Sequence, residues 1–229
     1  MNPVVLVPGL LCSSEIFAAQ IPALWSLGPV TVASTLEGET IENAAASILR
    51  DAPPRFALAG ISMGGYLSLE IMRQAPSRVL KLALIDTSAR PDTVEQTRAR
   101  LQALARAKTG FMAVALLTLT GLLHPSRRAD LDILNINLRM ARSVGLEGYE
   151  RQTRIAMSRP DSRPFLGAIE VPTLVLVGDC DPLTPLDHSQ EIASAVRGAK
   201  LNVVPDSGHL SPIEQPGHVS EALAHWVQG

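Results

Sequence analysis

Short apolar runs alternate with helical patterns through the first part of the chain. Four of these runs are rich in aliphatic or β-branched residues, at 3–7 (PVVLV), 29–33 (PVTVA), 56–60 (FALAG) and 79–86 (VLKLALID). Helical patterns lie between them, near 39–51 and 63–74. Strands that are apolar on both faces and separated by helices are typical of a parallel sheet covered on both sides.

Two more apolar runs occur late in the chain, at 172–177 (PTLVLV) and 201–204 (LNVV), and a helical pattern near 219–228 follows them. We therefore predict an α/β fold: a doubly wound, mostly parallel sheet of about six strands with helices on both faces.

The alternation stops between residues 91 and 168, where helical periodicity continues without a convincing strand. Gly110 and the segments 121–125, 145–148 and 160–164 interrupt the pattern, which predicts three or four helices. Asp92, with Glu95 three residues later, predicts the N-cap and capping box of the first helix.

We accordingly divide the chain into an α/β core, residues 1–90 and 169–229, and an inserted helical lid, residues 91–168. Ligands bind beyond the carboxyl ends of parallel strands, so an insertion there is well placed to cover a site. A structural helical layer without a gating role is the alternative. In the stretch 111–123 (FMAVALLTLTGLL) we expect the substrate pocket to be walled by Phe111, Met112, Leu116 and Leu119, although packing of the lid on the core would use the same residues.

Composition narrows the class of protein. The 229 residues are 46% hydrophobic and 18% charged with a net charge of −2, which indicates a globular chain without the basic surface of a nucleic-acid binder. Two cysteines, Cys12 and Cys180, do not make a disulfide scaffold. The N-terminal apolar run has no positive segment before it, and 111–123 is too short to span a bilayer. We expect a cytoplasmic protein with no membrane or nucleic-acid partner.

The strongest chemical motif is the segment 60–65 (GISMGG), which contains G-x-S-x-G around Ser62. It follows an apolar strand and opens a helix, the context in which this motif presents a nucleophilic serine on a sharp, strained turn. Gly60 and Gly64 would remove side chains that collide there. An ordinary N-cap serine is the alternative.

A serine nucleophile needs a base, and His209 has the position for it. It lies in the loop 206–209 (DSGH) directly after the last strand, which places it at the same edge of the sheet as Ser62. The remaining histidines are interpreted as surface or packing residues: His124, His188, His218 and His225.

The base in turn needs a carboxylate to orient it. Residues 178–182 (GDCDP) follow the strand at 172–177, and we favour Asp181, because it lies further out on this loop and is followed by Pro-Leu-Thr-Pro, which stiffens the loop. Asp179 is the first alternative, and Asp86, at the end of another strand, is the second. Two backbone N–H groups should hold the oxyanion: that of Met63 after the serine, and that of Leu10 in the loop after the first strand.

With these residues the chain resembles the α/β-hydrolase superfamily over essentially its whole length. The similarity is carried by VLVPGLL, GISMGGYLSLEIMRQAPSRV, LALIDTSARPDT, VPTLVLVGDCDPLTP and VVPDSGHLSPIEQP. It is strongest toward the small cofactor-free branch that includes carboxylesterases and enol-lactone hydrolases, and the order Ser, Asp, His is the expected one. Pro8-Gly9 replaces the usual His-Gly, and the chain starts directly at the strand VVLV, so we expect no leading hairpin.

The expected function is that of a serine hydrolase that cleaves a carboxylic ester or related acyl bond through an acyl-enzyme, without a cofactor or metal. Acyltransferases, thioesterases, carbon–carbon hydrolases and hydroxynitrile lyases use the same triad and remain open. Two further alternatives are a binding protein with an idle triad and a cofactor-free oxygenase or perhydrolase. The partner is expected to be a small acyl substrate whose identity the sequence does not give.

Overall fold

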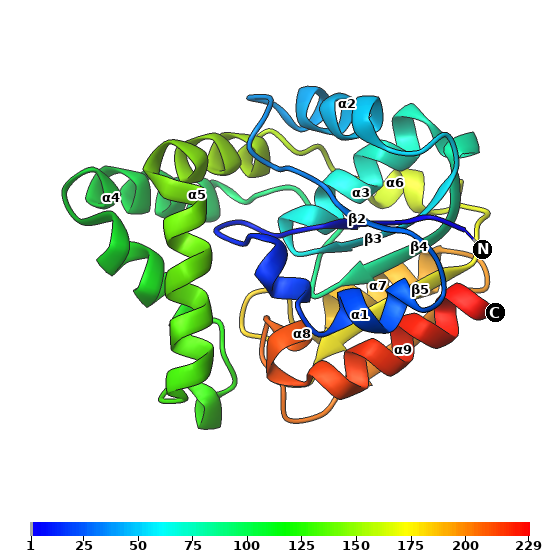
Figure 1. Cartoon of the computed structure of the whole chain (residues 1–229). Coiled ribbons are helices and arrows are strands. Elements are labelled where there is room, and N and C mark those ends of the chain that lie inside the picture. The colour runs from blue at the N-terminus through cyan, green and yellow to red at the C-terminus, as the bar shows by residue number, and fades with distance from the viewer. Residues whose placement is uncertain (1) are drawn as a thin grey trace.

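A six-stranded parallel sheet forms the centre of the computed structural model, which describes residues 2–229 (Figure 1). Its strands are β1 (Val4–Val7), β2 (Val30–Val32), β3 (Phe56–Ile61), β4 (Val79–Ile85), β5 (Thr173–Gly178) and β6 (Lys200–Val204). They lie in the order β2-β1-β3-β4-β5-β6, and each neighbouring pair is parallel. This confirms the predicted sheet, with strand ends that differ from the expected ones by one residue at most.

Helices cover both faces of the sheet, which confirms the doubly wound arrangement. One face carries α1 (Gln20–Trp25) and α9 (Pro216–Gln228), and the other carries α2 (Ile41–Asp51), α3 (Met63–Gln74), α6 (Arg163–Leu166) and α7 (Leu186–Ala195). The strands serve the two layers alternately, because successive side chains point to opposite faces. In β1, Val4 and Leu6 join the first buried cluster, while Val5 and Val7 join the second.

Between β4 and β5 the chain leaves the sheet and forms two long helices, α4 (Val94–Gly121) and α5 (Leu131–Met157), which pack together. Three short 3₁₀ turns, η1 (Ser14–Phe17), η2 (Pro76–Arg78) and η3 (Pro125–Arg127), and the short helix α8 (Ser211–Glu214) complete the fold. Figure 1 shows α4 and α5 on the side of the molecule opposite the two termini.

Both long helices bend at a glycine. The backbone departs from helical geometry at Gly110 in α4 and at Gly145 in α5. Gly145 has φ +69°, a conformation that glycine adopts without the steric cost of a side chain. The glycines that interrupt the sequence pattern therefore divide each long helix into two helical segments that meet at a kink, in line with the three or four helices predicted here.

The predicted N-cap of α4 is wrong by one residue. Thr93 caps the helix and forms a reciprocal capping box with Gln96, whereas Asp92 and Glu95 were expected in these positions. The same spacing of three residues occurs in both pairs, so the pattern alone does not separate them. Asp92 is instead buried in an ion pair with Arg100.

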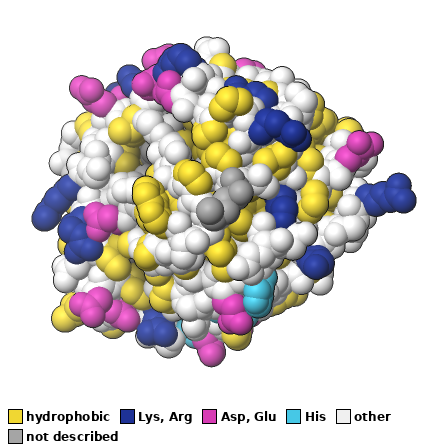
Figure 2. Space-filling view, turned by 45° about the vertical axis from the view of Figure 1, so that its right-hand side comes forward, with side chains coloured by type: hydrophobic (Ala, Val, Ile, Leu, Met, Phe, Trp, Pro, Cys, Tyr) yellow, Lys and Arg dark blue, Asp and Glu magenta, His cyan; other side chains and the backbone are white. Residues whose placement is uncertain are grey.

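By length and composition α4 is apolar enough to cross a membrane. The bend at Gly110 divides it, and neither part, 94–109 or 111–121, reaches the about 20 residues that a helical span needs. Figure 2 brings forward the side of the molecule that carries the termini in Figure 1. On the face shown, Lys and Arg side chains lie among apolar and neutral ones, and several of them lie beside Asp or Glu.

Candidate active site

Ser62 lies on the turn between β3 and α3, with φ +54° and ψ −118°. A non-glycine residue rarely adopts this conformation, and the turn is held from two sides. The Ser62 N–H donates to the carbonyl of Ile85 in β4 at 2.9 Å, and the Thr87 hydroxyl donates to the Ser62 carbonyl at 2.7 Å. The strained turn therefore holds the serine at the carboxyl end of the sheet.

The two glycines of the motif are required by close backbone approaches. A Cβ on Gly60 would lie 2.2 Å from the carbonyl oxygen of Gly64, and a Cβ on Gly64 would lie 2.0 Å from that of Val7. Neither position can hold a larger residue unless the backbone moves. The steric reason inferred from the sequence for these glycines is thus visible at both positions.

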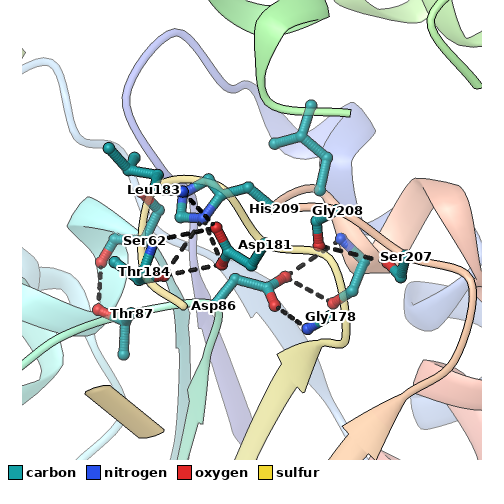
Figure 3. Close-up of polar contacts among 12 residues, drawn as sticks. Ser62, Asp86, Thr87, Gly178, Asp181, Leu183, Thr184, Ser207, Gly208 and His209 are labelled. Atoms are coloured by element: carbon teal, nitrogen blue, oxygen red, sulfur yellow. Dashed lines mark hydrogen bonds and ion pairs between the residues drawn. The ribbon is translucent and has the colours of Figure 1, made fainter. Parts of the chain in front are cut away.

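The loops after β5 and β6 bring a carboxylate and an imidazole to this serine. His209 Nε2 lies 2.8 Å from Ser62 Oγ, and His209 Nδ1 lies 2.7 Å from Asp181 Oδ2. Figure 3 shows the three side chains in contact one after another. His209 is 1% exposed and Asp181 is 4% exposed, so water screens their interaction little. This is the geometry of a nucleophile, a base and an orienting acid.

Further donors hold the Asp181 carboxylate in place. Its Oδ1 accepts from the N–H groups of Leu183 at 2.8 Å and Thr184 at 2.9 Å, and its Oδ2 accepts from the Thr184 hydroxyl at 2.8 Å. Burial raises the pKa of Asp181, but the charge of His209 and these hydrogen bonds outweigh it and keep the pKa below its usual value. Burial lowers the pKa of His209, but the charge of Asp181 and its hydrogen bond outweigh it and hold the pKa above its usual value.

The two alternative carboxylates have other contacts. Asp179 accepts from the backbone N–H groups of Asp206 and Ser207, each at 3.1 Å. It thus joins the loop after β5, which carries Asp181, to the loop after β6, which carries His209. Asp86 accepts from the N–H of Gly178 at 2.9 Å and the hydroxyl of Ser211 at 2.6 Å. Burial, with the nearby charge of Asp181, raises the pKa of Asp86 to about 8. Within residues 2–229 neither carboxylate bonds to His209.

The two residues whose backbone N–H groups were expected to hold an oxyanion lie at the same cavity as Ser62. Leu10 and Met63 both line the cavity above the serine. In the described part of the chain, neither N–H donates a hydrogen bond to another group. The neighbouring Leu11 has φ +62°, and its N–H donates to Oε1 of the buried Gln152 in α5 at 2.9 Å. The helical insertion thus holds the loop that carries Leu10, a contact that the sequence did not indicate.

A cavity of about 230 Å³ lies over Ser62, between the core and the insertion. Its core side includes Gly9, Cys12, Ile61, Leu183 and Leu210. Its other side is formed by the insertion through Gln96, Ala99, Arg100, Ala103, Thr118, Leu119, Leu122, Tyr149 and Ala156. Tyr66 of α3 completes the wall, and the lining is mostly apolar with few polar groups.

Of the four residues expected to wall the pocket, only Leu119 does so. Phe111 and Met112 pack against the buried cluster, with the Phe111 ring 6.0 Å from that of Tyr149. Leu116 is half-buried and does not line the cavity. Phe111 and Met112 therefore serve packing, and the helical repeat turns Leu119, and not Leu116, toward the cavity.

Wall residues that were not predicted from the sequence include Tyr66, Tyr149, Gln96 and Arg100. Tyr66 follows Ser62 by four residues, one helical turn, and this spacing could have indicated it. The other three lie on the insertion, and no local pattern marks them. Among residues 2–229, no group of three or more His, Cys, Asp or Glu side chains is arranged to hold a metal ion.

The chain matches the model of the alpha/beta hydrolase family over residues 4–222, and it belongs to this family. Its fold superposes on a thermophilic esterase from Thermogutta terrifontis, determined with malate bound, with a TM-score of 0.89 and 28% identity, covering 100% of this chain and 90% of the esterase.

Two curated relatives match part of the chain. The 3-oxoadipate enol-lactonase 1 of Acinetobacter baylyi is 27% identical over 175 residues, which are 74% of this chain and 62% of the lactonase. A poly(3-hydroxyalkanoate) depolymerase of Ectopseudomonas oleovorans is 28% identical over 170 residues, 74% of this chain and 59% of the depolymerase. The matches thus span less than two thirds of these relatives.

Proposed function

We propose that the protein is a serine hydrolase that cleaves a carboxylic ester or a related acyl bond through an acyl-enzyme. The observation that carries the proposal is the continuous contact from Ser62 through His209 to Asp181, beneath a mostly apolar cavity. The named activities of the relatives, an esterase, an enol-lactonase and a depolymerase, support ester bonds as the target.

The proposed reaction begins with proton transfer from Ser62 Oγ to His209 Nε2 as the oxygen attacks the substrate carbonyl. The N–H groups of Leu10 and Met63 stabilise the oxyanion that forms, and Asp181 stabilises the imidazolium. His209 then returns the proton to the leaving alcohol, which departs and leaves an acyl group on Ser62. In the second half, His209 takes a proton from water, which attacks the acyl group and releases the acid.

We propose that the insertion, residues 91–168, selects substrates and controls access, while the core carries out the chemistry. The insertion provides much of the cavity wall, including Leu119, Leu122 and Tyr149, but none of the three triad residues. Lids of this type open on the microsecond-to-millisecond timescale and often limit turnover.

The experiment is a hydrolysis assay with p-nitrophenyl esters of short to long acyl chains, beside thioesters and lactones. The wild-type protein should turn over at least one of these classes, and Ser62→Ala should lower kcat by about 10⁴-fold or more without loss of thermal stability. Ser26→Ala serves as the matched control and should retain activity, because Ser26 is exposed and lies directly after α1. Near-normal activity of Ser62→Ala would refute the assignment of the nucleophile.

A further inference from the structure

A second, smaller cavity of about 120 Å³ lies where the insertion joins the core. Four residues belong to the walls of both cavities: Tyr66, Gln96, Arg100 and Leu183. The smaller cavity also includes Thr184, whose hydroxyl bonds to the carboxylate of Asp181. It is therefore the immediate neighbour of the catalytic cavity and continues it away from the apolar wall formed by Leu119.

The wall of the smaller cavity holds an excess of positive charge. The Nε of Arg100 lies 2.7 Å from Asp92 Oδ2, and Arg159 pairs with the same carboxylate. The side chain of Asp92 is 2% exposed, that of Arg159 is 6% exposed and that of Arg100 is 21% exposed. Two guanidinium groups thus share one carboxylate, which leaves one positive charge without a partner in a poorly hydrated place.

The third arginine of this cavity does not add to the excess. Arg90 forms ion pairs with Glu191 at 2.9 Å and with Asp187 at 3.1 Å. These two acids lie on α7, and they are not among the residues that line either cavity. In the described part of the chain, no Asp or Glu lines either cavity, so the charge presented to a ligand is positive.

Several nitrogen atoms in this wall have no hydrogen-bond partner in the described part of the chain. Within residues 2–229, Nη1 of Arg100 and Nη2 of Arg159 make no hydrogen bond. The Nδ1 of His188, in the same wall, is buried and has no partner among these residues. Arg159 is also held in place, because its guanidinium stacks 4.1 Å from the ring centre of Tyr66. Buried charge of this kind is costly unless an opposite charge pairs with it.

We propose that the two cavities form one substrate site, in which a free carboxylate of the substrate binds Arg100 and Arg159 while its ester carbonyl lies at Ser62. The substrate class is then an ester or lactone that carries a second, ionised carboxyl group. A planar guanidinium matches a carboxylate with two parallel hydrogen bonds, and Arg is suited to such recognition. This inference rests on the proposed hydrolase function and adds the chemical class of its substrate.

The test compares esters that differ only in charge. The p-nitrophenyl monoesters of adipic, pimelic and suberic acid are measured against the same esters with the free carboxyl replaced by a carboxamide, which has the same shape without charge. Acetyl esters of 4-hydroxybenzoate and 4-hydroxybenzamide place the group on the alcohol side instead. In either the acyl-side or the alcohol-side series, the wild type should hydrolyse the carboxylate ester with a kcat/KM roughly 10–100-fold higher than that of the carboxamide ester, mainly through a lower KM. A hydrogen bond to a charged group contributes enough binding free energy to give a ratio of this size.

The preference should also fall as ionic strength rises, since salt screens the attraction. In Arg100→Gln the ratio of carboxylate to carboxamide ester should approach one. Arg139→Gln is the matched control, because Arg139 lies on α5 of the same insertion and pairs with Glu15 at the surface. It should keep the wild-type ratio. A purely structural ion-pair cluster would lower the melting temperature of Arg100→Gln and leave this ratio unchanged.

The outcomes distinguish failure of the carboxylate site from failure of the proposed hydrolase function. If the wild type hydrolyses the charged and uncharged esters of both arms equally, or if Arg100→Gln retains the preference, the carboxylate site is refuted while the hydrolase function stands. If no ester in either arm or in the acyl-chain series is hydrolysed, the proposed function itself fails. Should Arg100→Gln not fold, the wild-type ratio and its dependence on salt decide the question.

Discussion

Two aspartates in one loop have different tasks, although they lie only two residues apart. Asp181 contacts the imidazole of His209 and is fixed by the N–H and hydroxyl of Thr184. Asp179 instead accepts backbone N–H groups of the loop that carries His209. The carboxylate of Asp181 therefore contacts His209 directly, whereas that of Asp179 joins the two loops that carry Asp181 and His209.

This difference predicts the effects of single amide replacements. Asp181→Asn should lower kcat by about 10⁴-fold, because an amide favours the wrong tautomer of His209. Asp179→Asn retains an oxygen acceptor for one of its two backbone donors and should lose less than about tenfold. Steady-state kinetics of both variants on one p-nitrophenyl ester tests the pair. A larger loss in Asp179→Asn would mean that the register of the acid loop is wrong.

The pH dependence of activity follows from the charge on Asp181. His209 can take the proton of Ser62 only as neutral imidazole, and Asp181 raises the pKa of His209 above its usual 6.5 despite burial. We therefore expect kcat/KM to rise with pH through an ionisation above pH 6.5 and to be lost as pH falls through it. In Asp181→Asn this ionisation should move to lower pH. A wild-type acid limb centred below pH 6.5, or one that stays in place in the variant, would contradict the assignment.

Among the elements, α4 lines the cavity near both of its ends and packs against the buried cluster through residues between them. Leu119 lines the cavity and is 1% exposed, whereas Leu116, three residues earlier, is half-buried outside it. The two leucines therefore offer a matched pair on one helix. They separate the effect of cavity shape from the general effect of losing a leucine from the insertion.

Leu119→Ala should change the preference between short and long acyl esters by roughly 10–200-fold in kcat/KM, because it enlarges the cavity. Leu116→Ala should leave this preference unchanged. Truncation of a buried leucine also costs about 2–5 kcal/mol of stability, so the ratio of two esters on one preparation is the proper readout. A uniform loss on all esters in Leu119→Ala, without a change in the ratio, would show that Leu119 acts only in packing.

The sequence predicted the strands more closely than the ends of the helices. Apolar runs predicted each strand end to within one residue, because a strand buried on both faces is apolar along its whole length. The glycines at 110 and 145 correctly predicted interruptions, because the backbone leaves helical geometry at both positions. The Asp92 cap was displaced to Thr93, since tertiary pairing with Arg100 and Arg159 uses the Asp92 side chain.

At the scale of the whole molecule, the insertion and the core support each other's part of the site. The side chain of Gln152 is fully buried between them: Oε1 accepts from the Leu11 N–H, and Nε2 donates to Thr35 Oγ1, both at 2.9 Å. Leu11 follows Leu10, the residue proposed as an oxyanion donor. Gln152 is therefore a positioning residue that acts through this loop.

Gln152→Ala leaves a buried N–H without a partner, which costs about 1–3 kcal/mol. It should also lower kcat more than it raises KM, by up to the roughly 10²–10³-fold that loss of one oxyanion donor costs. Thr35→Val is the matched control, since it removes the other partner of Gln152 and keeps the contact to Leu11. Kinetics and thermal unfolding of both variants distinguish the roles. An unchanged kcat in a destabilised Gln152→Ala would leave Gln152 a purely structural role.

The parts of the site differ in how far the sequence could predict them. The serine, aspartate and histidine each follow a recognisable strand, so the topology of a parallel sheet brings them to one edge. The arginine pair has no such signal, because Asp92, Arg100 and Arg159 meet only when the two ends of the insertion come together. Contacts between residues so far apart depend on packing that no local pattern records.

Ser62 is proposed to be a nucleophile that His209 activates. Ethyl p-nitrophenyl methylphosphonate tests this proposal most directly, because attack by a serine oxygen releases one p-nitrophenol and leaves a stable adduct. We expect release of one equivalent per protein molecule, a matching increase in intact mass, and peptide mapping of the adduct to Ser62. Ser62→Ala should show neither the release nor the adduct, and His209→Ala should react far more slowly. Ester hydrolysis without an adduct, or an adduct on another residue, would contradict the account.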